Sequence, residues 1–208
     1  MCACAIRIGF VGRFYYFCRM TADSRAYETK DFTVDMEAGE YWRLFHDAVR
    51  VRRFCARCPN FGRSWACPPF DREAETGLRS YRRVLLITTK IIPSQGLDEG
   101  ASSRELIACQ RERVERRLFE MERECDGRAL TAVGSCTECD GLECSRLHGT
   151  PCRHPERVRP SLEAYGFDVG RTVADLFGMR ILWSRGGRVP EYLLLVCALF
   201  YNSDSAEF

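Results

Sequence analysis

The stretch CTECDGLECSRLHGTPC, residues 136–152, decides how this chain is organised, because it places four cysteines in one loop. Cys136, Cys139, Cys144 and Cys152 share the loop with two glycines and a proline, which disfavour a regular helix or strand. The turn of a C-x-x-C segment lets two sulfur atoms face one centre, and two further thiolates complete a four-sulfur ligand set. This spacing predicts a metal site. We expect a [4Fe–4S] iron–sulfur cluster there, with zinc as the alternative.

A second cysteine loop comes earlier in the chain, with the sequence CARCPNFGRSWACPP. Cys55, Cys58 and Cys67 supply three thiolates, one fewer than a structural zinc site requires. A second [4Fe–4S] cluster held by three cysteines would leave one iron open to substrate, water or a remote ligand, which would make this loop the reactive centre. A distant cysteine could instead complete the set. The candidates are Cys109 and Cys125, although both are expected to be small hydrophobic residues of a helix.

The number and placement of the cysteines favour metal binding over disulfides. The chain has 13 cysteines, an odd number that leaves at least one thiol unpaired, and they cluster at ligand-like spacing. With 208 residues the chain is long enough to bury a core, whereas disulfide-dependent scaffolds are usually short. Reduced thiols are typical of the cytoplasm, so we expect a cytoplasmic protein.

Charge and hydropathy argue against nucleic acid and membranes as partners. The formal net charge is only +2, so no strong field attracts an anionic surface. The longest apolar run, residues 192–201, has the length of a buried strand and is too short to span a membrane. The N-terminus is interrupted by glycine and arginine and does not have the pattern of a signal peptide. Since Met20 or Met36 would also serve as a start, we treat residues 1–35 as an N-terminal extension and residues 36–208 as one cysteine-rich α/β domain.

Hydrophobic periodicity predicts a sheet covered by helices. The β-branched run at residues 83–92 predicts a buried strand, and the helical spacing of Val114, Leu118 and Met121 predicts a long helix after it. Such a strand–helix–strand unit favours an α/β fold, with a mixed sheet of about four to five strands and both cysteine loops at the sheet edge. The other expected elements are a short strand at 27–35, helices at 40–53, 161–165 and 168–177, a strand at 129–135, and a closing hairpin of strands 179–183 and 191–201.

Other catalytic signatures are absent from the sequence. There is no G-x-G-x-x-G after a strand, no phosphate-binding Walker loop and no G-x-S-x-G nucleophile elbow. Near the cysteines, His154 is expected to lie around the metal or on the surface and not to bind it. Arg153, Arg157 and Arg159 are either solvated charges, or they neutralise an anionic cluster or meet an acidic partner. Trp65 is expected to shield the first loop from water. An enzymatic role, as an iron–sulfur oxidoreductase or its accessory subunit, is left open.

Three segments carry a resemblance to a known family. They are CPNFGRSWACPP at 58–69, GSCTECD at 134–140 and PCRHPERVRPSLEAYGFDV at 151–169, in that order. Together they resemble a prokaryotic family of predicted metal-binding proteins, one of the families of unknown function, over about residues 40–201. The resemblance implies a cytoplasmic protein that uses all seven loop cysteines as metal ligands, and it implies no reaction. The segment SRGGRVPEY departs from the Asn- and Gly-rich turn of that family.

The sequence therefore predicts a soluble iron–sulfur protein that acts in electron transfer or as a component of a redox enzyme. The predicted ligands are Cys136, Cys139, Cys144 and Cys152 for one [4Fe–4S] cluster, and Cys55, Cys58 and Cys67 for a second. A redox partner protein is expected. The alternatives are a zinc-stabilised binding module without redox activity, and a metal carrier or sensor that releases its metal to a chelator. The pattern does not specify the substrate or the oligomeric state.

Overall fold

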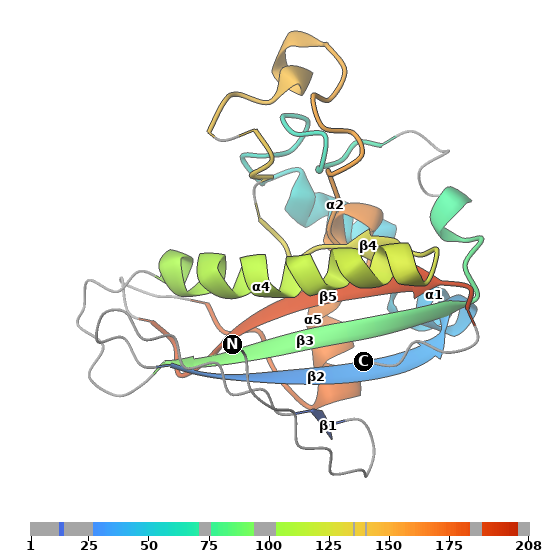
Figure 1. The fold of residues 1–208 in the computed structure, drawn as a ribbon, viewed down its shortest axis with the longest axis vertical. Helices are drawn as coiled ribbons and strands as arrows, with labels where there is room; N and C mark the ends of the chain where they lie inside the picture. The colour runs from blue at the N-terminus through green and yellow to red at the C-terminus, as the bar shows by residue number, and fades with distance from the viewer. Residues whose placement is uncertain are drawn as a thin grey trace.

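Three long antiparallel strands form the centre of the protein, and two shorter strands flank them (Figure 1). In this computed structural model the strands are β1 (Arg13–Phe14), β2 (Tyr27–Glu37), β3 (Arg83–Pro93), β4 (Arg128–Leu130) and β5 (Leu193–Tyr201). Their order across the sheet is β1-β2-β3-β5-β4, so the last strand of the chain lies between β3 and β4. The structure describes residues 13–14, 27–70, 76–93, 103–134, 136–139, 141–183 and 189–203.

β3 is buried on both faces because it lies between β2 and β5. Its side chains alternate, so that Val84 and Leu86 face one helical layer while Leu85 and Ile87 face the other. A strand covered on both sides is continuously apolar, which is the pattern that its sequence shows. The strand predicted at 83–92 is confirmed, and so is the one predicted at 27–35, which forms most of β2.

Helices cover both faces of the sheet (Figure 1). α4 (Ser103–Glu124) lies across one face, where Val114 and Leu118 belong to a core cluster shared with β3 and β5. α1 (Ala38–Phe45) and α5 (Val169–Phe177) contribute to the core cluster of the opposite face. The predicted α/β fold is confirmed, and the long helix and the helix at 168–177 lie where the sequence places them.

The helix predicted at 40–53 is in fact two helices. α1 ends at Phe45, and α2 (Ala48–Cys55) begins after a break at His46 and Asp47. The Asp47 carboxylate accepts a hydrogen bond from the backbone N–H of Arg50 at 3.0 Å and so caps the new helix. The ring of His46 contacts the carbonyl oxygen of Tyr165 at 3.1 Å. Because of this break, α2 runs in its own direction and ends at Cys55, the first cysteine of the first loop.

The prediction of a closing hairpin is wrong. The five described strands all pair antiparallel, whereas we expected a mixed sheet. Residues 179–183 form no strand, and the turn predicted at 184–188 lies outside the described residues. β5 pairs antiparallel with β3 on one side and with β4 on the other, which leaves it no free edge for a hairpin partner. The strand predicted at 129–135 is also shorter, because Thr131 leaves the ladder for an isolated parallel bridge to Ser161.

Both cysteine loops lie together beyond α4, on one side of the sheet (Figure 1). The first loop begins at the C-terminus of α2, and the second follows shortly after β4. Each loop is therefore held at its start by an ordered element of the domain.

Gly166 allows the segment after the second loop to pack against α2. Its φ is +88°, and a Cβ atom there would lie 2.9 Å from both Cα and Cβ of Ala48. We expect Gly166→Ala to lower the free energy of unfolding by about 3 kcal/mol, because it adds left-handed backbone strain to a steric overlap. Urea-induced unfolding measures the loss.

Gly178→Ala is the matched control for this substitution. Gly178 also has a positive φ, +64°, but no atom lies within 4 Å of the position of a Cβ. It should lose only the backbone contribution, about 1–2 kcal/mol. Equal losses of unfolding free energy at the two positions would show that the chain around Ala48 moves aside at no cost.

Candidate metal centre

The first cysteine loop is a succession of tight turns that folds its three thiols back towards one another. The backbone N–H of Cys58 donates to the carbonyl of Cys55 at 2.9 Å, and that of Cys67 donates to the carbonyl of Ser64 at 3.0 Å. The loop is closed by Gly62, which has a φ of +68° and donates its N–H to the carbonyl of Pro68 at 2.8 Å. Backbone hydrogen bonds therefore place the three thiols in one neighbourhood.

The second loop also folds through local turns. The N–H of Leu142 donates to the carbonyl of Cys139 at 2.9 Å, and Cys144 leads directly into the short 3-10 helix η1 (Ser145–His148). Arg153 reaches back across this loop and donates to the carbonyl of Glu143 at 2.7 Å. The same guanidinium nitrogen lies 3.9 Å from Sγ of Cys139, so a positive charge stands beside one predicted ligand.

The two loops interlock through Arg146 and Trp65. Nη1 of Arg146, in the second loop, donates to the carbonyl of Ser64 at 2.8 Å and also to that of Cys67, while Nη2 donates to that of Pro69 at 2.6 Å. In return, Nε1 of Trp65 in the first loop lies 3.2 Å from two oxygens of the second, the hydroxyl of Ser145 and the carbonyl of Thr150. Trp65 therefore joins the loops, a role that its expected function as a water shield did not include.

Electrostatic effects show which thiols are neighbours. Burial raises the pKa of Cys67, and the nearby thiols of Cys58 and Cys55 raise it further. Burial is likewise the main cause that raises the pKa of Cys136, and Cys139 and Cys152 contribute to it. The described thiols thus form two sets, Cys55 with Cys58 and Cys67, and Cys136 with Cys139 and Cys152. Cys144, at the start of η1, is half-buried.

The donor chemistry of these sets fits a thiolate-bound metal. All seven loop cysteines are free thiols, and burial raises the pKa of Cys55, Cys67 and Cys136, an effect that a bound metal would reverse. Within the described ranges, no group of three or more His, Cys, Asp or Glu side chains already stands in a geometry that would hold a metal ion. The thiols of each set therefore lie near one another but not in ligand geometry. Their side chains would have to move closer together to bind a metal.

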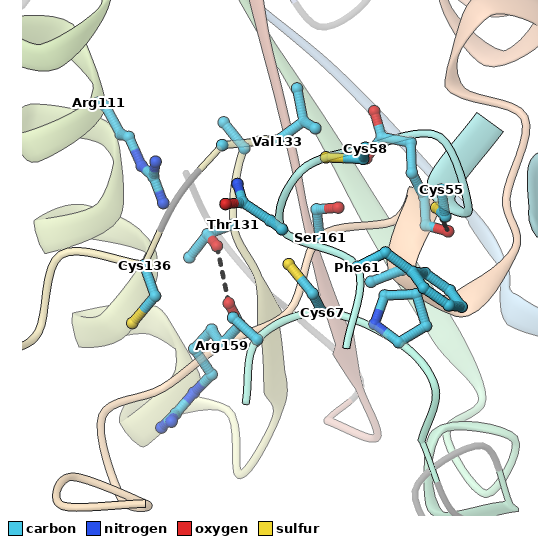
Figure 2. A pocket seen from close by; sticks show the side chains of 17 residues that line it. Cys55, Cys58, Phe61, Cys67, Arg111, Thr131, Val133, Cys136, Arg159 and Ser161 are labelled. Carbon is cyan, nitrogen blue, oxygen red and sulfur yellow. Dashed lines mark hydrogen bonds between the residues drawn. The ribbon is translucent and has the colours of Figure 1, made fainter. Parts of the chain in front are cut away.

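A cavity of about 100 Å³ separates the two loops (Figure 2). Cys55, Cys58 and Cys67 line it on one side, and Cys136 lies across from them. Figure 2 shows the sulfur of Cys67 pointing into the space between the loops, whereas the sulfur of Cys136 is turned away from Cys67. Besides the thiols, the polar residues of the wall are Asn60, Arg111, Thr131, Arg159, Ser161 and Glu163.

Salt bridges hold the walls of this cavity in place. Arg159 binds both carboxylate oxygens of Glu122 on α4, with N–O distances of 2.7–3.0 Å. Arg111 pairs with Glu115 on the same helix at 2.6 Å. These guanidinium groups are therefore neutralised by α4 and serve as scaffold. Arg159, for which we expected either solvated charge or contact with a cluster, is bound to the fold.

Glu163 is a site residue that sequence reasoning missed. It begins the 3-10 helix η2 (Glu163–Tyr165), and its carbonyl oxygen lies 3.8 Å from Sγ of Cys55. Burial raises the pKa of its carboxyl, while hydrogen bonds from the Ser161 hydroxyl and from its own N–H act in the opposite direction. In the sequence it looks like an ordinary first-turn residue, because nothing in PSLEAYG shows that this turn faces a cysteine loop.

The remaining described cysteines lie elsewhere. Cys109 contacts the hydroxyl of Tyr27 at 3.4 Å, Cys125 packs against the core beneath α4, and Cys197 is buried in β5. None of the three lines the cavity. They are therefore not positioned to complete the first ligand set.

Comparison with known proteins agrees with the chemistry of these loops. The sequence profile of a family described as "Predicted metal-binding protein (DUF2284)" matches residues 45–197, a range that contains all seven loop cysteines. The chain belongs to this family. The resemblance inferred from the three cysteine-rich segments is thereby confirmed. Searches of curated proteins and of solved structures found no match. In the described part of the chain, no helix is both long and apolar enough to cross a membrane.

Arg146 offers a direct test of the interlocked loops. Arg146→Lys keeps the charge but loses the planar fork that reaches three carbonyls, so we expect the free energy of unfolding to fall by about 2–3 kcal/mol. Limited proteolysis should also become faster in both loops, because each loop loses its anchor to the other.

The control is Arg116→Lys on the exposed face of α4. Arg116 makes an i,i+4 ion pair with Glu112 at 2.7 Å and is 69% exposed, so its loss should change stability by less than about 0.5 kcal/mol. Faster cleavage in the second loop alone would contradict mutual anchoring by Arg146.

Proposed function

We propose that this metal-binding protein holds two [4Fe–4S] clusters and acts in electron transfer or as a component of a redox enzyme. One cluster would use Cys136, Cys139, Cys144 and Cys152, and the other Cys55, Cys58 and Cys67. Such clusters supply one-electron chemistry. The observation that carries the proposal is the interlocking of two cysteine loops around one cavity, which puts the first thiol set and Cys136 of the second beside the same space.

The cavity favours iron–sulfur over structural zinc in the first loop. Structural zinc sites are closed by four protein ligands, and zinc sites with three protein ligands keep an open position for chemistry. Here three thiols line a cavity that has room for a small ligand, which fits a centre with one accessible metal position. The second loop has four cysteines of its own and fits a relay that passes electrons to or from the first.

Metal analysis after anaerobic purification tests the proposal. We expect a brown protein with iron and acid-labile sulfide in equal amounts and with little zinc. A colourless protein with one or two zinc ions would establish the zinc-stabilised module. Metal that leaves readily to a chelator while the chain stays folded would establish a carrier or sensor.

Substitutions in each loop separate the two centres within that analysis. Cys139→Ser should remove one cluster's share of iron and destabilise the fold, because metal binding is coupled to folding. Cys67→Ser should abolish redox activity with a smaller loss of stability. Equal destabilisation by both would indicate two structural sites. Cys109→Ser is the control, since this thiol lies outside both loops.

A cytoplasmic location and an acidic redox partner belong to the same proposal. Residues 48–70, which contain the first loop, hold five exposed arginines and no acidic residue: Arg50, Arg52, Arg53, Arg57 and Arg63. Phe54, 62% exposed, lies among them, and so does the exposed thiol of Cys58. Arg50 is paired with Asp168 at 3.0 Å, but the face as a whole is basic and apolar, which suits an acidic protein that docks beside the first centre.

Ionic strength tests this docking face. Reduction of the protein by an acidic iron–sulfur or flavin donor should slow steeply between low and high salt, because screening weakens steering between opposite charges. The double variant Arg53→Gln/Arg57→Gln should be slower at low salt and less sensitive to salt. Arg116→Gln, on α4, should behave as the unmodified protein. A rate independent of salt would contradict the acidic partner.

A further inference from the structure

The first thiol set lacks a fourth ligand, and the structure indicates where that ligand comes from. We propose that the carboxylate of Glu163 completes the metal centre of Cys55, Cys58 and Cys67. This assignment rests on the proposed function: the carboxylate would occupy the accessible metal position as a displaceable oxygen ligand, beside three sulfur ligands from the protein. Carboxylate oxygens are established ligands of transition metals beside thiolates, and they bind less strongly to soft centres than sulfur does.

Position is the first reason for this assignment. Glu163 lines the same cavity as the three thiols, and its own backbone carbonyl contacts the thiol of Cys55. The charge of Glu163 also acts on Cys55, second only to burial among the causes that raise the pKa of that thiol. The backbone contact and the effect of its charge together place Glu163 beside the incomplete set.

Charge pairing is the second reason. Around the cavity and its rim, the half-buried carboxylates of Glu122 and Glu115 are matched by Arg159 and Arg111, and Glu138 is matched by Arg157 at 2.7 Å. Glu163 makes no ion pair with any arginine, lysine or histidine in the described ranges, and its hydrogen bonds come from Ser161 and its own N–H. A carboxylate that is removed from water without a cation is costly, and a metal in the cavity would offset that cost.

The alternative ligand in the cavity wall is Cys136. It lines the cavity, but its electrostatic neighbours are Cys139 and Cys152 of its own loop. Its sulfur is also turned away from Cys67 (Figure 2). Cys136 is therefore assigned to the second centre. Glu163 is then the remaining candidate for a fourth ligand in the cavity wall.

The test compares Glu163→Gln and Glu163→Cys with unmodified protein after anaerobic reconstitution with ⁵⁷Fe and sulfide. Unmodified protein should show a Mössbauer signal from one iron with a non-sulfur ligand. Glu163→Gln should change that signal, lose a single iron and no sulfide on brief exposure to air, and release iron to a chelator about tenfold faster or more. Glu163→Cys should abolish the distinct iron and restore resistance to the chelator, which an indirect structural role would not produce.

Glu156→Gln is the matched control, because Glu156 is exposed near the second loop and does not line the cavity. A Glu163→Gln protein with the signal and iron release of unmodified protein overturns the ligand assignment and leaves the iron–sulfur proposal standing. Loss of the distinct iron in Cys136→Ser, with Glu163→Gln unaffected, would transfer the role to Cys136. Failure of unmodified protein to take up iron defeats the proposed function itself.

Discussion

The guanidinium group of Arg146 determines the relation between the two halves of the candidate metal centre. Loops made of turns have few long-range backbone hydrogen bonds of their own, so three carbonyls of the first loop are satisfied by one side chain of the second. Nε1 of Trp65, in the first loop, in turn contacts two oxygen atoms of the second loop. Because both loops share these contacts, metal bound to one thiol set would stabilise the loop geometry that the other needs. By thermodynamic reciprocity, metal bound to the second set would have the same effect on the first.

Behind the loops, α4 acts as a rigid support. Glu122 accepts from Arg159 and from the backbone N–H of Ala129 at 2.8 Å, so one carboxylate fixes both the start of β4 and the segment that leads to η2. Arg157 similarly holds Glu138 inside the second loop. These ion pairs have a fixed geometry. They therefore hold the segments that form the cavity walls in a defined orientation. Glu163 differs from them in having no cation, and this contrast marks it as a ligand candidate.

Much of the fold follows from local sequence pattern, and most of the site does not. The apolar run of β3 and the stripe on α4 identify those elements because burial alone determines their side chains. The position of β5 could not be read in this way, since an apolar strand is compatible with any neighbour and pairing is decided by the whole sheet. Spacing likewise singled out seven cysteines as candidate ligands. Arg146 and Glu163 have no local signature, because an arginine in a loop and a glutamate in a first turn are usually solvated.

The insertion of β5 between β3 and β4 has a consequence for the order of assembly. β4 pairs with β5 alone among the described strands, so it has no edge to join until β5, much later in the chain, has been synthesised. The second cysteine loop follows β4 directly and depends on it for its position. During synthesis the first loop can form next to α2, while β4, from which the second loop starts, stays outside the sheet until β5 pairs with it. The strand that leads into the second cysteine loop therefore completes its pairing only after β5 has entered the sheet.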